Sequence, residues 1–173
     1  MAGFLELVSY AFGWIYTICW SASFYPQPIL NYRRGTTKGT TIEFPVVNVL
    51  GFLAYFIFNS AFLYSPVIRS QYAARNNGLT PTVRFNDLAF AAHAVVMSVI
   101  VLTQFWKRIW GLKKGPGKER QISSPILAVI AGSFIAPLLV LMLVKSSDTP
   151  DPRVGWAYID VVYISQMRVP AYD

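Results

Sequence analysis

The chain has 173 residues, of which 54% are hydrophobic, 16% aromatic and only 13% charged. A soluble domain has about 25% charged residues, so this chain has too few to cover a water-facing surface, and its long apolar blocks predict a lipid environment. The formal net charge is +7, but the basic residues lie almost entirely between the apolar blocks. This is typical of membrane-protein loops and excludes nucleic acid as a predicted partner.

Residues that support metal or covalent chemistry are few. One cysteine and one histidine exclude a disulfide framework and a cysteine-rich metal site, so we predict no metal and no cofactor. No nucleophile, base and orienting group converge, and we predict no enzymatic activity. The first basic residue is Arg33; a cleavable signal peptide begins with positive charge, so we expect the first apolar block to stay as a membrane helix.

Five hydrophobic segments follow one another in the chain, at residues 7–30, 44–64, 87–106, 124–144 and 154–166. The first four supply the roughly 20 residues that a helix needs to cross a bilayer, whereas the fifth loses its apolar character by Gln166 and is too short. Pro26 lacks a backbone donor and crowds the preceding turn, so it predicts a kink or break near the end of the first segment. The pattern predicts an all-α membrane protein.

The basic residues between segments predict the topology. Nine Lys and Arg residues lie in the gaps after the first and third segments, and five lie in the gaps after the second and fourth. Because positive loops stay in the cytosol, we expect the first and third loops to be cytosolic. The N-terminus is then expected on the lumenal or extracellular side.

Asp87 opens the third segment on the side predicted to be lumenal. An ionisable side chain inside a membrane segment is a functional candidate, because an unpaired charge there costs several kcal/mol. Asp87 is therefore a candidate for binding and releasing a proton. Aspartate is also common at helix N-termini, where a cap stabilises by about 1 kcal/mol, and the residue alone leaves both interpretations open.

Other polar side chains recur at helical spacing. Asn48 and Asn59 share one face of the second segment, which is expected to point inward. His93 and Gln104 share one face of the third segment. The two asparagines bind a polar solute or join helices by hydrogen bonds. His93 relays protons or bridges helices, and Pro26 marks a structural kink or a gate.

A set of motifs extends over residues 13–104. They are Gly13-Trp14-Ile15-Tyr16, the stretch Trp20 to Gln27, Asn31-Tyr32-Arg33-Arg34, Lys38 to Phe44, Asn48 to Phe52 with Ala54-Tyr55 and Phe58-Asn59, and Asn86 to Phe90 with His93 to Val96. Together they resemble the cystinosins, a family of PQ-loop transporters. The stretch from Asn86 to Val96 is the part most specific to that family.

This resemblance implies a seven-helix fold of two three-helix bundles and a linking helix. Here it predicts the first PQ-loop bundle at residues 1–108, a basic cytosolic loop at 109–123 and the linking membrane helix at 124–144. A lumenal loop and a truncated fifth helix are expected at 145–173. The fold would thus be incomplete.

The resemblance also implies a function: export of L-cystine together with a proton from the lysosome or vacuole to the cytosol, by a multi-pass protein of that membrane. Asp87 matches a proton-coupling aspartate, Asn48 a substrate-pocket asparagine, and Phe24, Pro26 and Gln27 the first PQ gate region. We therefore expect Asn48, Gln27 and Phe24 to contact substrate and Pro26 to act in gating. The expected partners are L-cystine, protons and lipid, with a homo-oligomer as a further possibility.

The resemblance weakens through the fourth segment and ends near Ser165. The second PQ motif and a further aspartate of the family are missing, so the chain is expected to be truncated before the second PQ loop. Two alternatives stay open: a transport-inactive or regulatory membrane protein, and a PQ-loop carrier of another solute, such as a cationic amino acid or a sugar.

Overall fold

The computed structural model describes residues 2–113, 121–146, 152–153 and 155–166. Regular structure in these ranges is helical, apart from an isolated bridge between Thr36 and Lys113, which confirms the all-α prediction. The helices are α1 (Ala2–Ser23), α2 (Pro26–Arg34), α3 (Glu43–Tyr64), α4 (Pro66–Arg75), α5 (Phe85–Thr103), α6 (Lys107–Trp110), α7 (Ser124–Ser146) and α8 (Tyr158–Ser165).

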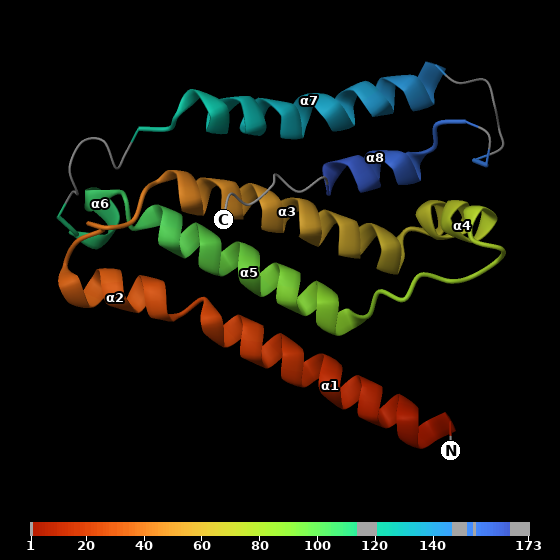
Figure 1. The fold of residues 1–173 in the computed structure, drawn as a ribbon, viewed down its shortest axis with the longest axis horizontal. Coiled ribbons are helices and arrows are strands. Elements are labelled where there is room, and N and C mark those ends of the chain that lie inside the picture. Colours follow the sequence, from red (N-terminus) through yellow and green to blue (C-terminus); the bar gives the residue numbers. More distant parts are fainter. Residues whose placement is uncertain (1, 114–120, 147–151, 154, 167–173) are drawn as a thin grey trace.

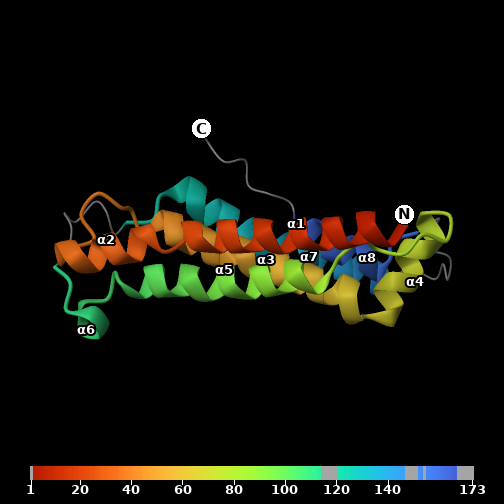
Figure 2. The ribbon, with the colours of Figure 1, turned by 90° about the horizontal axis from the view of Figure 1, so that it is seen from below.

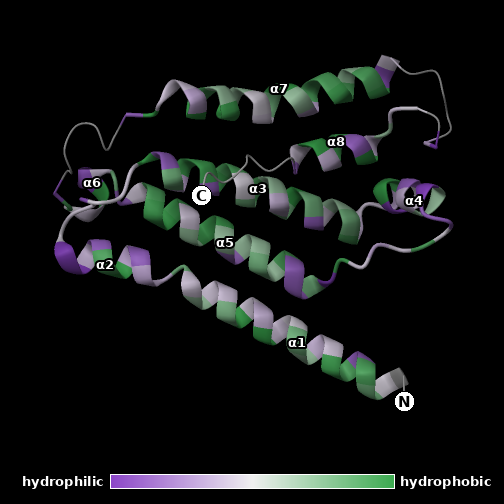
Figure 3. Cartoon of the chain, viewed as in Figure 1, coloured by the Kyte–Doolittle hydropathy of each residue, from purple (hydrophilic) through white to green (hydrophobic). Residues whose placement is uncertain are grey.

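Long apolar helices α3, α5 and α7 have the length and composition needed to cross a membrane. Figure 3 shows apolar residues along these helices and polar residues gathered at their ends and on α2, α4 and α6. Helix α1 has 22 residues and is long enough, but it does not reach the same hydropathy. The first predicted segment is thus the least apolar of the four long ones.

The break predicted at Pro26 is present. Helix α1 ends at Ser23, and Pro26 occupies the first turn of α2, where its missing N–H costs no hydrogen bond. Helix α2 ends at Arg34 and is capped by Gly35, whose φ of 63° is left-handed and whose N–H bonds back to the helix, as expected of a glycine at this position. The first hydrophobic segment is therefore two helices.

Helix α5 lies between α1 and α3 and packs most closely against α3 (Figures 1 and 2). Helix α1 approaches α5 closely at Gly13. A Cβ added at Gly13 would lie 3.0 Å from Nδ2 of Asn86 on α5. The missing side chain therefore permits the close contact. Helices α1, α3 and α5 form the bundle that holds the candidate site.

Helix α7 lies on the other side of α3 and packs mainly against α8 (Figure 1). Only 6% of its most apolar window is buried within the chain, so most of its apolar surface is available to lipid. Helix α8 has eight residues, too few to cross a bilayer, in agreement with the short fifth segment expected from the sequence.

The first and third loops meet at one end of the molecule, as the topology prediction requires (Figure 1). The N–H of Lys113 donates to the carbonyl of Gly35 at 2.7 Å, and the Thr36 hydroxyl donates to the Lys113 carbonyl at 3.1 Å. Residues 114–120 of the basic loop lie outside the described residues. The loop after α3 lies at the opposite end.

The gap between the second and third segments is not only a loop, contrary to our expectation. It contains α4, which starts immediately after α3 because the Ser65 side chain caps it by accepting from Ile68 N–H at 3.4 Å, while Pro66 occupies the first turn. A charged amphipathic helix of ten residues has no apolar block, so hydropathy alone misses it.

Candidate functional site

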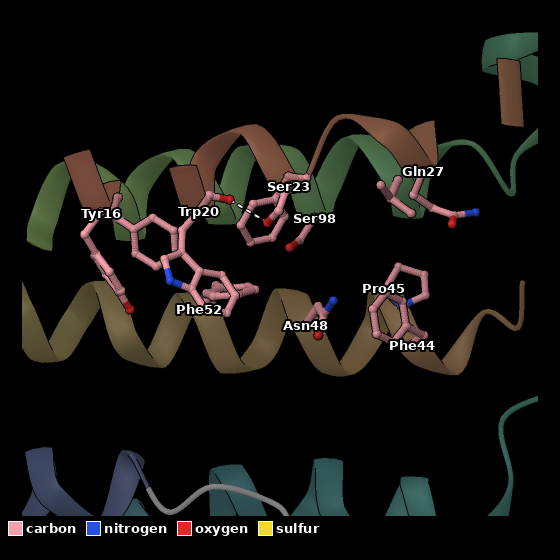
Figure 4. Close-up of a pocket in the computed structure, with 12 residues that line it drawn as sticks. Tyr16, Trp20, Ser23, Gln27, Phe44, Pro45, Asn48, Phe52 and Ser98 are labelled. Carbon is pink, nitrogen blue, oxygen red and sulfur yellow. Dashed lines mark hydrogen bonds between the residues drawn. The ribbon is translucent and has the colours of Figure 1, made fainter. Parts of the chain in front are cut away.

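A pocket of about 500 Å³ lies within the bundle of α1, α2, α3 and α5 (Figure 4). Its lining residues are Tyr16, Trp20, Ser23, Phe24, Gln27, Phe44, Pro45, Asn48, Phe52, Phe90, Ser98 and Val101. All twelve side chains are uncharged, and aromatic rings dominate. The pocket therefore suits a small solute with an apolar body and no net charge.

The aromatic wall is a packed cluster contributed by three elements. The Phe24 ring, between α1 and α2, lies 5.2 Å from the Phe52 ring of α3 and 6.2 Å from the Phe90 ring of α5, centroid to centroid. Phe52 and Phe90 are 6.3 Å apart and nearly perpendicular. Edge-to-face contacts of this kind stabilise by about 0.5–1.5 kcal/mol beyond area burial, so they fix the wall where the chain breaks before Pro26.

Three of the residues predicted to contact substrate line this one pocket: Phe24, Gln27 and Asn48. Pro26 does not line the pocket but begins α2 beside it. Asn59 lies about three turns beyond Asn48 on α3, is buried, and donates to the Tyr55 carbonyl at 2.7 Å. The two asparagines of the same predicted face therefore have different surroundings.

Sequence reasoning missed Ser98 and the aromatic side chains of Tyr16, Trp20 and Phe52 as pocket residues. Ser98 is 3% exposed and lines the pocket together with Phe90 and Val101 of the same helix. These three α5 positions are separated by eight and three residues, a spacing that places them on one helical face. That shared face was the available signal.

A buried amide network attaches α2 to the end of α5. Gln27 Nε2 donates to Asn31 Oδ1 at 3.0 Å and to the Thr40 hydroxyl at 2.8 Å. Asn31 Nδ2 donates to Gln104 Oε1 at 2.8 Å, and Gln104 Nε2 donates to the Pro28 carbonyl at 2.9 Å. The amide nitrogen of Gln27 is thus occupied by the chain itself, and in Figure 4 it points away from the aromatic wall.

Gln104→Leu is expected to lower the free energy of unfolding by about 2 kcal/mol, because it leaves the buried Asn31 amide and the Pro28 carbonyl without their partners. Gln104 is 2% exposed, so water cannot replace the lost bonds. The measurement is the thermal midpoint of the purified chain in detergent. Thr17→Val is the matched control, since the buried Thr17 hydroxyl donates to the Gly13 carbonyl of its own helix; equal shifts for both variants would contradict the role of the network.

His93 connects α5 to the break between α1 and α2. Its Nε2 lies 3.1 Å from the Tyr25 hydroxyl, and its ring makes an edge contact with Phe24 at 6.1 Å. This geometry is that of a bridge between helices, one of the two interpretations that the sequence left open. Its Nδ1 is buried without a hydrogen-bond partner in the described part of the chain, and the proton relay remains a prediction.

Asp87 lies at the other end of α5 and does not line the pocket. Its Oδ2 accepts the backbone N–H of Arg84 at 2.8 Å. Arg84 is the N-cap of α5, so Asp87 stabilises the helix start from the third helical position and is not the N-cap that the sequence suggested as an alternative. Eleven residues separate Asp87 from Ser98, or about 16 Å along the helix axis. Phe90, which lines the pocket, is closer and lies three residues, or about 4.5 Å along the axis, after Asp87.

Comparison with known proteins agrees with the motifs. Residues 8–68 match the PQ loop repeat family, a range that contains most of α1, all of α2 and α3, and most of the residues that line the pocket. The chain is 40% identical to cystinosin from Bos taurus over 101 residues, which are 58% of this chain and 27% of the relative. It is 38% identical to a cystinosin homolog from Arabidopsis thaliana over 130 residues, or 74% of this chain and 46% of the relative.

Over much of its length, the chain is therefore similar to cystinosins. A cystine transporter from Saccharomyces cerevisiae is 27% identical over 139 residues, 78% of this chain and 51% of that protein. The chain thus spans between about a quarter and a half of the length of these relatives. Phe24, Gln27 and Asn48 all lie within the matched repeat.

Proposed function

We propose that this chain binds L-cystine in the pocket between α1, α3 and α5 and takes part in its transport across a lysosomal or vacuolar membrane. The observation that carries the proposal is that Phe24, Gln27 and Asn48, three positions of the PQ-loop repeat, line one uncharged pocket. Relatives named cystinosin and cystine transporter supply the solute. A polar group in an aromatic pocket is the usual arrangement for orienting a small ligand.

The proposed direction is from the lumen to the cytosol, with a proton moving along. In this arrangement the end of the molecule with α2 and α6 faces the cytosol, which the excess of basic residues there supports. The N-terminus and α4 then face the acidic lumen, as does Asp87 at the start of α5. Transport requires the bundle to alternate its access, and the break before Pro26 is the place where α2 can swing relative to α1.

A pair of asparagine variants tests the pocket. Asn48→Ala is expected to raise the KM for L-cystine uptake about tenfold, because the amide lines the pocket and has no hydrogen-bond partner in the described chain, so a ligand is its available partner. The measurement is uptake of radiolabelled L-cystine into proteoliposomes containing the full chain, with a pH gradient. Asn59→Ala is the matched control, since Asn59 lies on the same helix outside the pocket.

The outcomes separate the alternatives. Saturable uptake by the parent that Asn48→Ala weakens and Asn59→Ala does not would support the proposal. Uptake of L-lysine or a sugar in place of L-cystine would indicate a PQ-loop carrier of another solute. A well-inserted parent that moves none of these solutes would indicate the transport-inactive alternative, in which the chain acts as a regulatory or structural membrane protein.

A further inference from the structure

Ser98 has an unusual environment for a serine in a membrane helix. Its side chain is 3% exposed, and its Oγ has no hydrogen-bond partner among the described residues. A helical serine or threonine usually donates to a carbonyl three or four residues earlier. In this chain Ser60 does so to Phe56 at 2.7 Å, and Thr17 does so to Gly13 at 2.9 Å.

The free hydroxyl of Ser98 faces the pocket. Figure 4 shows it projecting from α5 toward the space opposite Asn48, which projects from α3. Both residues line the pocket. A buried hydroxyl without a partner costs free energy in the empty protein, so a ligand that bonds to it recovers an interaction that the fold leaves unmade.

The chemistry of the walls restricts the ligand. None of the lining residues is charged, so a net charge placed there would lack a counter-charge and would be penalised by desolvation. A zwitterionic α-amino acid group carries both charges next to each other and has no net charge. A hydroxyl donates to its carboxylate, an amide donates to the carboxylate and accepts from the ammonium, and aromatic faces attract the ammonium.

We infer that Ser98 is a specificity-determining residue whose hydroxyl, together with the Asn48 amide, binds one zwitterionic amino-acid end of the transported solute. The inference rests on the proposed function and deepens it. It also explains why the pocket would select a net-neutral amino acid such as L-cystine over a cationic one. The apolar rings of Phe24 and Phe52 then contact the uncharged middle of the solute.

The test compares Ser98→Ala with a matched serine. Ser98→Ala is expected to weaken binding of radiolabelled L-cystine to the purified full chain about tenfold, the loss of one hydrogen bond. Because it removes a buried hydroxyl without a partner, the thermal midpoint of the ligand-free protein should stay the same or rise. Ser98→Thr keeps the hydroxyl and should keep most of the affinity, and Ser60→Ala should leave the Kd unchanged.

Each failure has its own signature. If the parent binds L-cystine and Ser98→Ala binds it with the same Kd, the role of Ser98 is overturned and the proposed function stands. A clearly lower midpoint for ligand-free Ser98→Ala would show that the hydroxyl is structural and would also overturn the inference. A parent without saturable L-cystine binding would overturn the proposed function, and the inference with it.

Discussion

Arg75→Met is expected to lower the free energy of unfolding by about 3 kcal/mol, because it breaks a partly buried ion pair and frees two carbonyls at once. Arg75 donates to both carboxylate oxygens of Asp160, at 2.5 and 2.8 Å. It also donates to the carbonyls of Pro152 and Gly155, at 2.6 and 3.1 Å. One guanidinium group thereby attaches α4 to the start of α8.

The loss of stability in Arg75→Met should be larger than the loss on breaking an ordinary exposed ion pair, which lowers the free energy of unfolding by about 0–1 kcal/mol. The side chains of Arg75 and Asp160 are only 26% and 18% exposed, and the bidentate geometry suits a planar guanidinium better than an ammonium. The measurement is the thermal midpoint of the purified chain. Arg69→Met is the matched control, because Arg69 lies on the same helix and is exposed; an equal shift for both variants would contradict the assignment.

The pH dependence of this loss has a defined sign. The hydrogen bond from Arg75 is the main reason that the pKa of Asp160 lies below its ordinary value of 3.8, and the Ala157 N–H acts in the same direction. A carboxyl group with a lowered pKa in the folded state stabilises the fold above its unfolded pKa and loses this effect as the pH falls through the folded pKa. The difference between parent and Arg75→Met should therefore be the same at pH 7 and pH 5 and should shrink only below about pH 4. The proposed acidic lumen would leave the pair intact.

The long elements and the helix break could be predicted from the sequence because each has a local cause. Apolar runs of sufficient length predict α3, α5 and α7, and Pro26 ends the first segment for a steric reason that requires no tertiary contact. The pocket positions Phe24, Gln27 and Asn48 came from the family resemblance and not from spacing. Their convergence on one pocket is a property of the fold.

Contacts between distant segments could not be predicted in the same way. Arg75 and Asp160 are separated by 85 residues, and the sequence assigned Arg75 to a loop. Asn31 and Gln104 are separated by 73 residues, and nothing in their local sequence shows that their amides meet. Ser98 is conspicuous only after its surroundings are known, because what distinguishes it is that its hydroxyl has no hydrogen-bond partner among the described residues.

Asp87→Asn is expected to abolish proton-driven L-cystine uptake while leaving the stability of the chain nearly unchanged. The capping bond uses Oδ2 as the acceptor for the Arg84 N–H, and an asparagine side chain offers a carbonyl oxygen in the same place. An amide does not bind and release a proton at physiological pH, so the variant keeps the cap and loses the titration. The two interpretations of Asp87 thereby become separable.

Asp87→Ala completes the comparison, because it removes the cap and the titratable group together and should cost about 1 kcal/mol of stability in addition to uptake. Uptake in proteoliposomes and the thermal midpoint in detergent are measured for all three proteins. Retained proton-driven uptake by Asp87→Asn would reduce Asp87 to a helix cap and place coupling elsewhere. The opposite result is loss of proton-driven uptake with L-cystine exchange still present when both sides hold solute at equal pH. It would assign coupling to Asp87 and binding to the pocket, whose residues Phe90, Ser98 and Val101 follow Asp87 along α5, so that α5 is the element through which the proton and the solute are linked.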